Sequence, residues 1–337
     1  MTMMIAPLRQ LGVEVRHRDG FLPFDVCGPL HSATVEVDGS VSSQFITGLL
    51  LALPAARGEF TIDVRRAAST PYIDMTVEAA HCFGAEILHN GYTQFYIEGG
   101  QRYRPTDYSI EGDWSAAANF LVAGALFGDV RLTGLDTTSL QADISIMDIL
   151  MEAGASLSQI EDEPQDEESA NVKDSNDNEA ADAQEANAPQ GHRGLITAQK
   201  APLRAFDTDL NNCPDLFPIV AILAAFCHGR SNIQGFKRLA SKESDRGAAI
   251  LNMLTQMGVE ASAAGDILSI TGESVESRLL NGHLLKGGEY TSSHDHRMAM
   301  ALTVASWCAD SPIQIDDTSC IAKSFPAFLD AYRLIER

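Results

Sequence analysis

The sequence predicts a mixed α/β (α+β) fold, in which repeated β-α-β-α-β-β units surround buried helices. Two observations support this prediction. A helix-then-strand pattern recurs at an interval of about 70 residues, and a second series of more uniformly apolar helices alternates with it. With 337 residues and 45% apolar content, the chain is long enough for two domains, each with its own core.

The first series consists of amphipathic stretches that end in apolar-Gly-apolar and are followed by alternating residues. Its members are "PLRQLGVEV", "AAHCFGAEI", "LMEAGASL" and "LTQMGVEA", with glycines at Gly12, Gly84, Gly154 and Gly258. In the third and fourth copies the apolar residues fall at i, i+3, i+4 and i+7, which is one face of a helix. We expect each glycine to end a helix in the left-handed conformation, with a strand after it.

The second series is apolar on nearly all sides, so we expect its helices to be buried. Its members are "SSQFITGLLLALPAARGEFTI", "SAAANFLVAGALFGDVRL", "PDLFPIVAILAAFCHGRSNI" and "DHRMAMALTVASWCADSPIQI". Polar residues precede each of these helices, in "DGSVSSQF", "EGDWSAAAN", "DTDLNNCPD" and "SSHDHR".

An acidic segment interrupts the repeat between its third and fourth glycines. From Glu161 to Glu185 there are eleven acidic residues and one lysine, and the interval is longer than the others by about 34 residues. We predict that residues 161–191 are a disordered insertion between two strands of a hairpin, because they hold too few apolar residues to offset the entropy of ordering. The alternative is a charged binding tail or acidic scaffold formed by residues 161 to 190.

Composition excludes several functional classes. The formal charge of −22 argues against nucleic acid or an anionic membrane surface as a partner. The chain has neither a signal peptide nor an apolar run of membrane-spanning length, which predicts a cytoplasmic protein. The six cysteines lie far apart without CxxC, so we expect small buried residues in a reducing compartment rather than a zinc site.

The start of a helix attracts anions, because its free N–H groups and the helix dipole are positive there. Ser42, Ser43 and Gln44 therefore suit a phosphate or carboxylate, although simple N-capping also explains serines at this place. Ser115, in the second copy, is expected to be only a cap.

Charged residues also open the fourth first-series helix, in "RLASKESDRG". Lys242 and Arg246 are out of place at a helix start unless they face an anion, whereas a solvated turn with charge pairs is the alternative. Lys323 stands among small and apolar residues in "CIAKSFP", where the alternative is an ordinary surface lysine.

Together these motifs resemble one family, the 5-enolpyruvylshikimate-3-phosphate (EPSP) synthases, or 3-phosphoshikimate 1-carboxyvinyltransferases. The matching stretches follow the family's order over nearly the whole chain: "DGSVSSQFITGLLLALP", "STPYIDMT", "EGDWSAAANFLVAGAL", "NNCPDLFPIVAILAA", "SKESDR", "DHRMAMAL" and "CIAKSFPAF". The resemblance implies an enolpyruvyl transferase-like, two-lobed inverse α/β prism of βαβαββ repeats. Residues 1–108 would be the remainder of the N-terminal lobe and residues 109–337 the C-terminal lobe.

The resemblance also implies the reaction. This family transfers the enolpyruvyl group of phosphoenolpyruvate to the 5-hydroxyl of shikimate 3-phosphate and releases phosphate, in the aromatic amino-acid pathway. It uses no metal or organic cofactor, and we expect a monomer at full length. Cations must gather to bring two anionic substrates together, and an acid and a base must flank the reacting atoms.

The family's motifs assign roles to individual residues. Asp215 would accept the hydroxyl proton, Lys242 would lie beside the same hydroxyl, and Glu243 would protonate the methylene carbon. The shikimate 3-phosphate site would comprise Ser42, Ser43, Gln44, Ser69, Asp215 and Lys242, with Tyr72 close by. The phosphoenolpyruvate site would comprise Gln44, Arg246, Arg297 and Lys323. Asp295 and His296 would orient Arg297.

The chain departs from the family pattern in two places. The match begins in the middle of the pattern, without the early lysine and arginine or the Gly-rich segment, so we expect an N-terminally truncated member with an incomplete first lobe. In addition, Arg238 and Ala240 replace residues that line the phosphate site in some members.

Two alternatives follow: a non-catalytic fragment or half of a split enzyme, and a transferase acting on UDP-N-acetylglucosamine. The latter fits less well, because it uses a reactive cysteine upstream of this chain and because "SSQF" and "KESDR" match the shikimate enzyme better.

Overall fold

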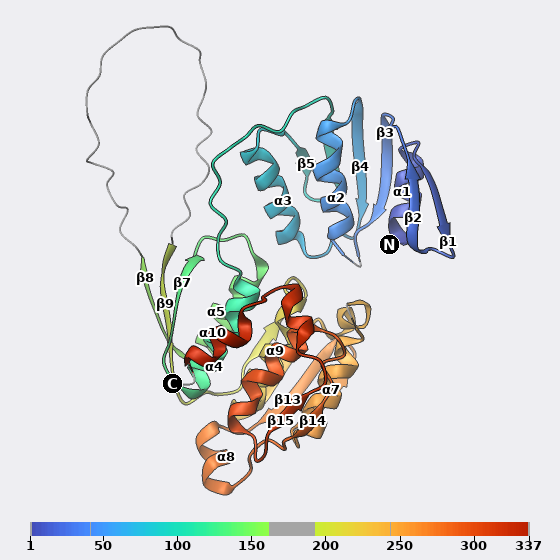
Figure 1. Cartoon of the computed structure of the whole chain (residues 1–337). Coiled ribbons are helices and arrows are strands. Elements are labelled where there is room, and N and C mark those ends of the chain that lie inside the picture. Colours follow the sequence, from blue (N-terminus) through green and yellow to red (C-terminus); the bar gives the residue numbers. More distant parts are fainter. Residues whose placement is uncertain (1, 41, 162–192, 243, 336–337) are drawn as a thin grey trace, which may run out of the picture.

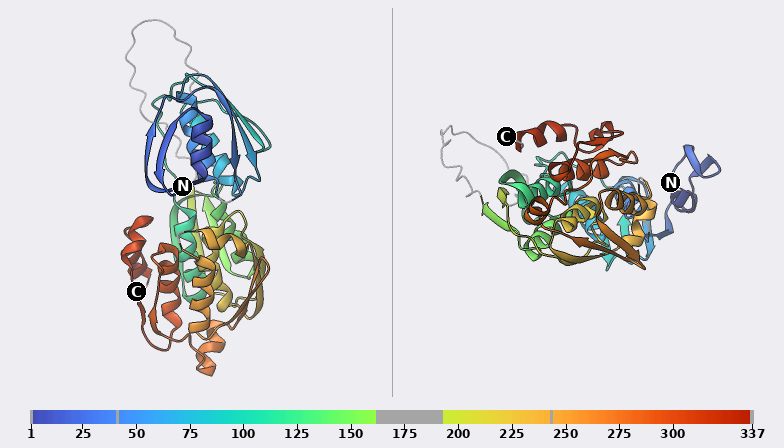
Figure 2. Two further views of the ribbon diagram at one scale, coloured as in Figure 1. Left: turned by 90° about the vertical axis from the view of Figure 1, so that its right-hand side faces the viewer. Right: turned by 90° about the horizontal axis from the view of Figure 1, so that it is seen from below.

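The computed structural model describes residues 2–40, 42–161, 193–242 and 244–335, which form two lobes lying one above the other (Figures 1 and 2). Each lobe has its own hydrophobic core. The first core ends at Ile97 in the sequence and the second begins at Trp114. The expected boundary at 108/109 falls within the connecting segment and stays a proposal.

In the N-terminal lobe a four-stranded sheet of order β3-β4-β6-β5 packs against helices, and a separate β1-β2 hairpin precedes it. β3 and β4 are parallel, and β6 is antiparallel to both of its neighbours. The helices are α1 (Ile5–Gln10), α2 (Gln44–Ala52) and α3 (Thr70–Cys82). The strands are β1 (Glu14–Arg18), β2 (Phe21–Cys27), β3 (Ala33–Asp38), β4 (Glu59–Arg65), β5 (Leu88–Asn90) and β6 (Gln94–Glu98).

In the C-terminal lobe three sheets surround packed helices, with strand orders β7-β9-β8, β10-β11-β13-β12 and β14-β15 (Figure 1). The helices are α4 (Trp114–Phe127), α5 (Ile146–Glu152), α6 (Phe217–Ala225), α7 (Arg246–Gln256), α8 (Val275–Asn281), α9 (His296–Ala305) and α10 (Phe328–Ile335). The strands are β7 (Val130–Asp136), β8 (Ser156–Glu161), β9 (Arg193–Gln199), β10 (Asp207–Asp209), β11 (Gly229–Gln234), β12 (Glu260–Ala264), β13 (Ile267–Gly272), β14 (Gly288–Tyr290) and β15 (Ile313–Ile315).

The first-series prediction is confirmed in all four copies. The helices are α1, α3, α5 and α7, and the strands that follow them are β1, β5, β8 and β12. The four glycines have φ values of +82°, +82°, +89° and +80°. Glycine is favoured at these positions because an added Cβ is strained in the left-handed region.

The burial predicted for the second series holds in the C-terminal lobe and fails in part for α2. All nine residues of α6 and thirteen of the fourteen residues of α4 are buried, because α4, α6 and α9 pack against one another. In α2 the buried residues are Ile46, Leu49 and Leu50, while Leu51 is 44% exposed. The reason is that α2 turns one side to the smaller core of the N-terminal lobe and has α3 beside it.

The acidic insertion joins β8 to β9, and these strands pair antiparallel with Glu161 opposite Gly194. The predicted hairpin is thus confirmed, while the predicted disorder concerns residues 162–192 and lies outside the described residues. The prediction for the cysteines is wrong at Cys27. This thiol is exposed on the β1-β2 hairpin, whereas Cys213, Cys227 and Cys308 are buried. None of the helices in the described part of the chain is long and apolar enough to cross a membrane.

Candidate active site

The N-terminal ends of the three buried helices α4, α6 and α9 meet at one place. Asp113 caps α4 by accepting a hydrogen bond from the Ser115 amide, and Asp295 caps α9 by accepting from the Arg297 amide. Asp215 lies in the short 3-10 turn directly before α6. Because each helix start carries partial positive charge, their meeting point favours anions.

Asp215 is the centre of three cations, of which Arg297 belongs to α9, while Lys242 and Arg246 come from the segment that opens α7. Its Oδ2 lies 3.0 Å from Nη2 of Arg297, and its Oδ1 lies 2.8 Å from Nη1 of Arg246 and 3.6 Å from Nζ of Lys242. Burial of Asp215 opposes its ionisation, but the charges of Arg297, Lys242 and Arg246 outweigh burial and hold its pKa well below the usual range. The carboxylate is therefore ionised throughout the physiological pH range.

Arg246 is fully buried between two carboxylates. Its Nε lies 2.8 Å from Oδ2 of Asp295, while its Nη1 holds Asp215. Burial opposes the charge of Arg246, yet Asp295 and Asp215 outweigh it and raise the pKa of the guanidinium. The expectation that Asp295 orients the Arg297 side chain is wrong, because the carboxylate pairs with Arg246 and meets Arg297 only at the backbone amide. His296 is buried beside Asp295, with Nδ1 3.9 Å from Oδ1.

The guanidinium of Arg297 is held from two sides. Its Nη2 pairs with Asp215, and its Nη1 donates to Oγ of Ser115. The Ser115 hydroxyl also faces the Asp143 carboxylate and lowers its pKa. The prediction that Ser115 is only a cap is therefore wrong, since Asp113 caps α4 and the Ser115 hydroxyl, in the first turn of that helix, contacts Arg297.

Asp143 also belongs to this cluster, although no sequence motif assigned it to the site. It lies in the 3-10 turn η3 (Ala142–Ser145) and is 4% exposed. Burial and the nearby charge of Asp215 raise the pKa of Asp143 to about 6, against the opposing charge of Arg297. One signal pointed to it: Asp143 stands shortly before the first-series helix α5, as Lys242 stands shortly before α7 in the fourth copy.

Two contacts bring the N-terminal lobe to the cluster. Oη of Tyr72, in α3, donates to Oδ2 of Asp143 at 3.3 Å, and Nη2 of Arg238 donates to Oγ of Ser69 at 3.0 Å. Burial, followed by the charges of Asp143 and Asp215, raises the pKa of Tyr72, so its hydroxyl is a hydrogen-bond donor. Arg238, a departure from the family pattern, thus lies at the predicted phosphate-binding serine.

The remaining predicted residues lie in several places. Ser42, Ser43 and Gln44 are together at the start of α2, where Oγ of Ser42 accepts from the Gln44 amide at 3.2 Å and Ser43 is buried. Lys323 is exposed at the end of the turn η7 (Ser319–Lys323), which packs against α9. Glu243 lies outside the described residues. Of the predicted set, the structure gathers Asp215, Lys242, Arg246 and Arg297.

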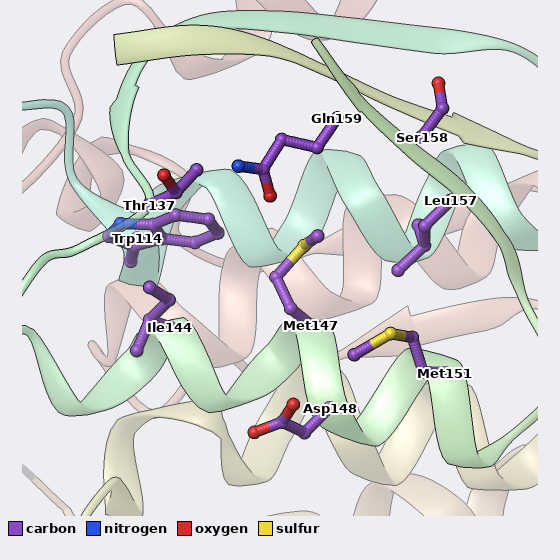
Figure 3. A pocket seen from close by; sticks show the side chains of 9 residues that line it. All are labelled: Trp114, Thr137, Ile144, Met147, Asp148, Met151, Leu157, Ser158 and Gln159. Carbon is purple, nitrogen blue, oxygen red and sulfur yellow. The ribbon is translucent and has the colours of Figure 1, made fainter. Parts of the chain in front are cut away.

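A cavity of about 360 Å³ lies next to this cluster but is not part of it (Figure 3). The cavity lies between α5 and β8, with Trp114 and Ile144 at one end and Met147 and Met151 along one side. None of the charged residues around Asp215 lines it. Within the described ranges, no group of three or more His, Cys, Asp or Glu residues is arranged to hold a metal ion.

The fold and the charged cluster define a protein of the enolpyruvyl transferase class. The structure of EPSP synthase from Acinetobacter baumannii superposes with a TM-score of 0.74 at 25% identity, covering 99% of this chain and 70% of that one. The enolpyruvyl transferase NikO from Streptomyces tendae gives a TM-score of 0.66 at 16% identity, with 98% and 69% coverage. These similarities confirm the predicted fold.

The sequence comparison identifies the family. Residues 1–332 match the family model of EPSP synthase (3-phosphoshikimate 1-carboxyvinyltransferase), and the chain belongs to this family. A 3-phosphoshikimate 1-carboxyvinyltransferase of Aeropyrum pernix is 36% identical over 324 residues, covering 96% of this chain and 65% of that protein. One of Clostridium botulinum (strain Eklund 17B / Type B) is 35% identical over 330 residues, covering 96% and 66%. The chain thus spans about two thirds of the length of these relatives.

Proposed function

We propose that the cluster around Asp215 transfers the enolpyruvyl group of phosphoenolpyruvate to the 5-hydroxyl of shikimate 3-phosphate. The 5-hydroxyl oxygen bonds to the central carbon of phosphoenolpyruvate as its proton passes to Asp215, and the methylene carbon gains a proton from Glu243. The former methylene carbon then gives up a proton as phosphate leaves the central carbon, and this restores the double bond between the two carbons. The products are EPSP and phosphate, and the expected cytoplasmic location is part of the proposal.

The observation that carries the proposal is the convergence of Lys242, Arg246 and Arg297 on one carboxylate. Cations that meet at three helix starts suit two substrates that bear two phosphates and a carboxylate. We assign Lys242 and Arg297, which are partly exposed, to direct substrate contact. Arg246 is fully buried, so in this arrangement we assign it to holding Asp215 and Asp295 in place. Lys323 remains a proposed ligand of phosphoenolpyruvate.

The pKa of Asp215 explains how substrate binding prepares the base. Its three cations hold the pKa low, and a carboxylate with a low pKa is a weak base. When an anionic substrate pairs with Arg297 and Lys242, these cations stabilise the Asp215 carboxylate less. The pKa of Asp215 then rises, and the residue becomes a stronger base in the complex where a base is needed.

On the N-terminal lobe the proposed shikimate 3-phosphate site comprises polar residues at the starts of two helices. Ser42, Ser43 and Gln44 open α2, and Ser69 precedes α3. Ser69 has φ +54° and already accepts a hydrogen bond from Arg238 of the other lobe. A phosphate bound at Ser69 therefore has a guanidinium beside it, which is a strong pairing for phosphate.

Phosphate release from phosphoenolpyruvate tests the proposal directly. The chain is incubated with phosphoenolpyruvate and either shikimate 3-phosphate or UDP-N-acetylglucosamine. We expect release with the first acceptor and none with the second. Release with UDP-N-acetylglucosamine instead would assign the chain to the related transferase activity.

A second candidate, half of a split enzyme, is favoured by the β1-β2 hairpin. Phe21, Leu22 and Val26 are 74%, 65% and 59% exposed, which is typical of a surface that another polypeptide covers. This candidate predicts no phosphate release from the chain alone. Release is expected after addition of a polypeptide that corresponds to the part of the Aeropyrum pernix relative that this chain does not cover. A non-catalytic fragment predicts no release in either case.

A further inference from the structure

Asp143 is a buried carboxylate to which neither the family's motifs nor the proposed reaction gives a role. It is 4% exposed and lies where three elements meet: η3, the start of α4 and helix α3 of the other lobe. The turn that carries it is tied to the start of α4, because the neighbouring Gln141 side chain accepts from the Trp114 amide and donates to the Gly112 carbonyl.

Polar side chains connect Asp143 to Arg297. The Ser115 hydroxyl faces the Asp143 carboxylate and lowers its pKa, and Nη1 of Arg297 donates to Oγ of Ser115. On its other side the same carboxylate accepts from Oη of Tyr72. Arg297 thus has one carboxylate in direct contact, Asp215, and a second one reached through a single hydroxyl.

We propose that Asp143 is a positioning residue of the active site, which fixes the Arg297 guanidinium through Ser115 and aligns it with Tyr72 of the N-terminal lobe. The inference rests on the proposed function in one respect, namely that Arg297 binds phosphoenolpyruvate. The chain of contacts itself does not depend on that function.

The geometry separates the tasks of the two aspartates. Asp215 is 21% exposed at its side chain and directly contacts three cations, so it can meet a substrate. Asp143 is buried behind Ser115 and Tyr72 and pairs directly with no cation among the described residues. Its Oδ1 and the Nε of Arg297 are both buried without a hydrogen-bond partner within the described part of the chain. The Arg297 guanidinium is therefore held by its two Nη groups alone, and loss of the Ser115 contact frees it to turn.

The test uses the whole chain with Asp143→Asn and Ser115→Ala, and with Asp148→Asn as the matched control. Asp148 is an exposed aspartate of α5, only five residues from Asp143. The first readout is the side-chain 15N–1H resonance of Arg297, assigned by its disappearance in Arg297→Lys. We expect this resonance to shift in Asp143→Asn and in Ser115→Ala, and to stay in place in Asp148→Asn.

The second readout is the calorimetric dissociation constant of phosphoenolpyruvate with shikimate 3-phosphate present, from pH 5 to pH 8. At pH 7.5 we expect Asp143→Asn to bind about tenfold more weakly than the wild type, because the hydrogen-bond network then lacks its charged acceptor. The ratio of the two constants should fall towards one at pH 5, where the wild-type carboxyl is protonated. Charged and titratable groups that face Asp143, and so shape this dependence, are Tyr72, Arg297, Asp215, Asp113 and Cys213. Substrate phosphates also titrate near pH 6 but cancel in the ratio.

The two readouts separate the inference from the proposed function. A wild-type chain that binds neither ligand contradicts the proposed function, while the Arg297 resonance still decides whether Asp143 positions the guanidinium. An unchanged Arg297 resonance in a folded Asp143→Asn variant overturns the inference, and so does an affinity ratio that is constant with pH. A constant ratio indicates a general packing role, because packing does not depend on the charge of Asp143.

Discussion

The Arg297 guanidinium at the start of α9 lies 3.0 Å from the Asp215 carboxylate in front of α6 (Nη2 to Oδ2). The same carboxylate holds Arg246, which is itself bound to the cap of α9, Asp295. Two helix starts are thereby joined by alternating charges. Removal of Arg246 takes the cation away from the buried carboxylate of Asp295, whereas Asp215 keeps Arg297 and Lys242.

Asp215→Asn is expected to lower kcat for enolpyruvyl transfer by about 100- to 10,000-fold, because an amide cannot accept the hydroxyl proton. Phosphate release from phosphoenolpyruvate measures the effect. Asp330→Asn is the control, since Asp330 is exposed on α10 and is expected to leave the rate unchanged. A rate for Asp215→Asn within threefold of the wild type would show that another group accepts the proton.

Arg246→Ala is expected to lower the free energy of unfolding by about 3–5 kcal/mol, because it strands Asp295 as an uncompensated buried charge. Urea denaturation followed by circular dichroism measures it. Arg333→Ala breaks the exposed Arg333–Asp330 pair of the same lobe and should change stability far less. Equal losses in the two variants would contradict the assignment of Arg246 as the internal cation of the cluster.

The raised pKa of Asp143 predicts how stability depends on pH. Because the folded-state pKa of about 6 exceeds the ordinary value of 3.8, the unfolded chain releases this proton first. Relative to Asp143→Asn, the wild type should therefore lose stability as pH rises from about 4 to about 6, by on the order of 3 kcal/mol. Denaturation of both proteins at several pH values measures the difference. A flat difference for Asp143→Asn would mean that the carboxyl has an ordinary pKa.

Two helical glycines should respond in opposite ways to alanine. A Cβ at Gly124, in α4, would lie 2.9 Å from the Ala198 carbonyl oxygen of β9 and 2.9 Å from Cβ of Val130. Gly124→Ala should therefore destabilise the protein by about 1–3 kcal/mol through overpacking. A Cβ at Gly48, in α2, meets nothing within 4 Å, so Gly48→Ala should stabilise by about 0.5–1 kcal/mol. Thermal unfolding of both variants checks the prediction, which fails if Gly124→Ala is neutral.

Arg238→Ala is expected to weaken the binding of shikimate 3-phosphate by about tenfold, because it removes the guanidinium beside Ser69. Calorimetric titration with shikimate 3-phosphate measures the effect. Arg230→Ala, at an exposed arginine of β11, is the matched control. If both variants bind equally well, the phosphate lies elsewhere than at Ser69.

Much of the local structure could be predicted from the sequence, because its causes act over a few residues. A glycine ends a helix wherever a left-handed residue is needed, as at Gly84 and Gly154, and the apolar periodicity before it shows the helix face. Burial of α4 and α6 followed from their uniformly apolar sequences, whereas the exposure of Leu51 in α2 depends on how little of the N-terminal lobe's core surrounds that helix.

The residue types of the site were also determined by the sequence, since Asp215, Lys242, Arg246 and Arg297 stand in motifs at helix starts. Only the tertiary structure decided which of these starts meet, and so which charges pair. Arg246 became an internal cation, Ser115 a link to Arg297, and Asp143 a member of the cluster. The physical reason is that helix propensity and capping act between neighbours in sequence, while the pairing of buried charges depends on the packing of α4, α6 and α9 against one another.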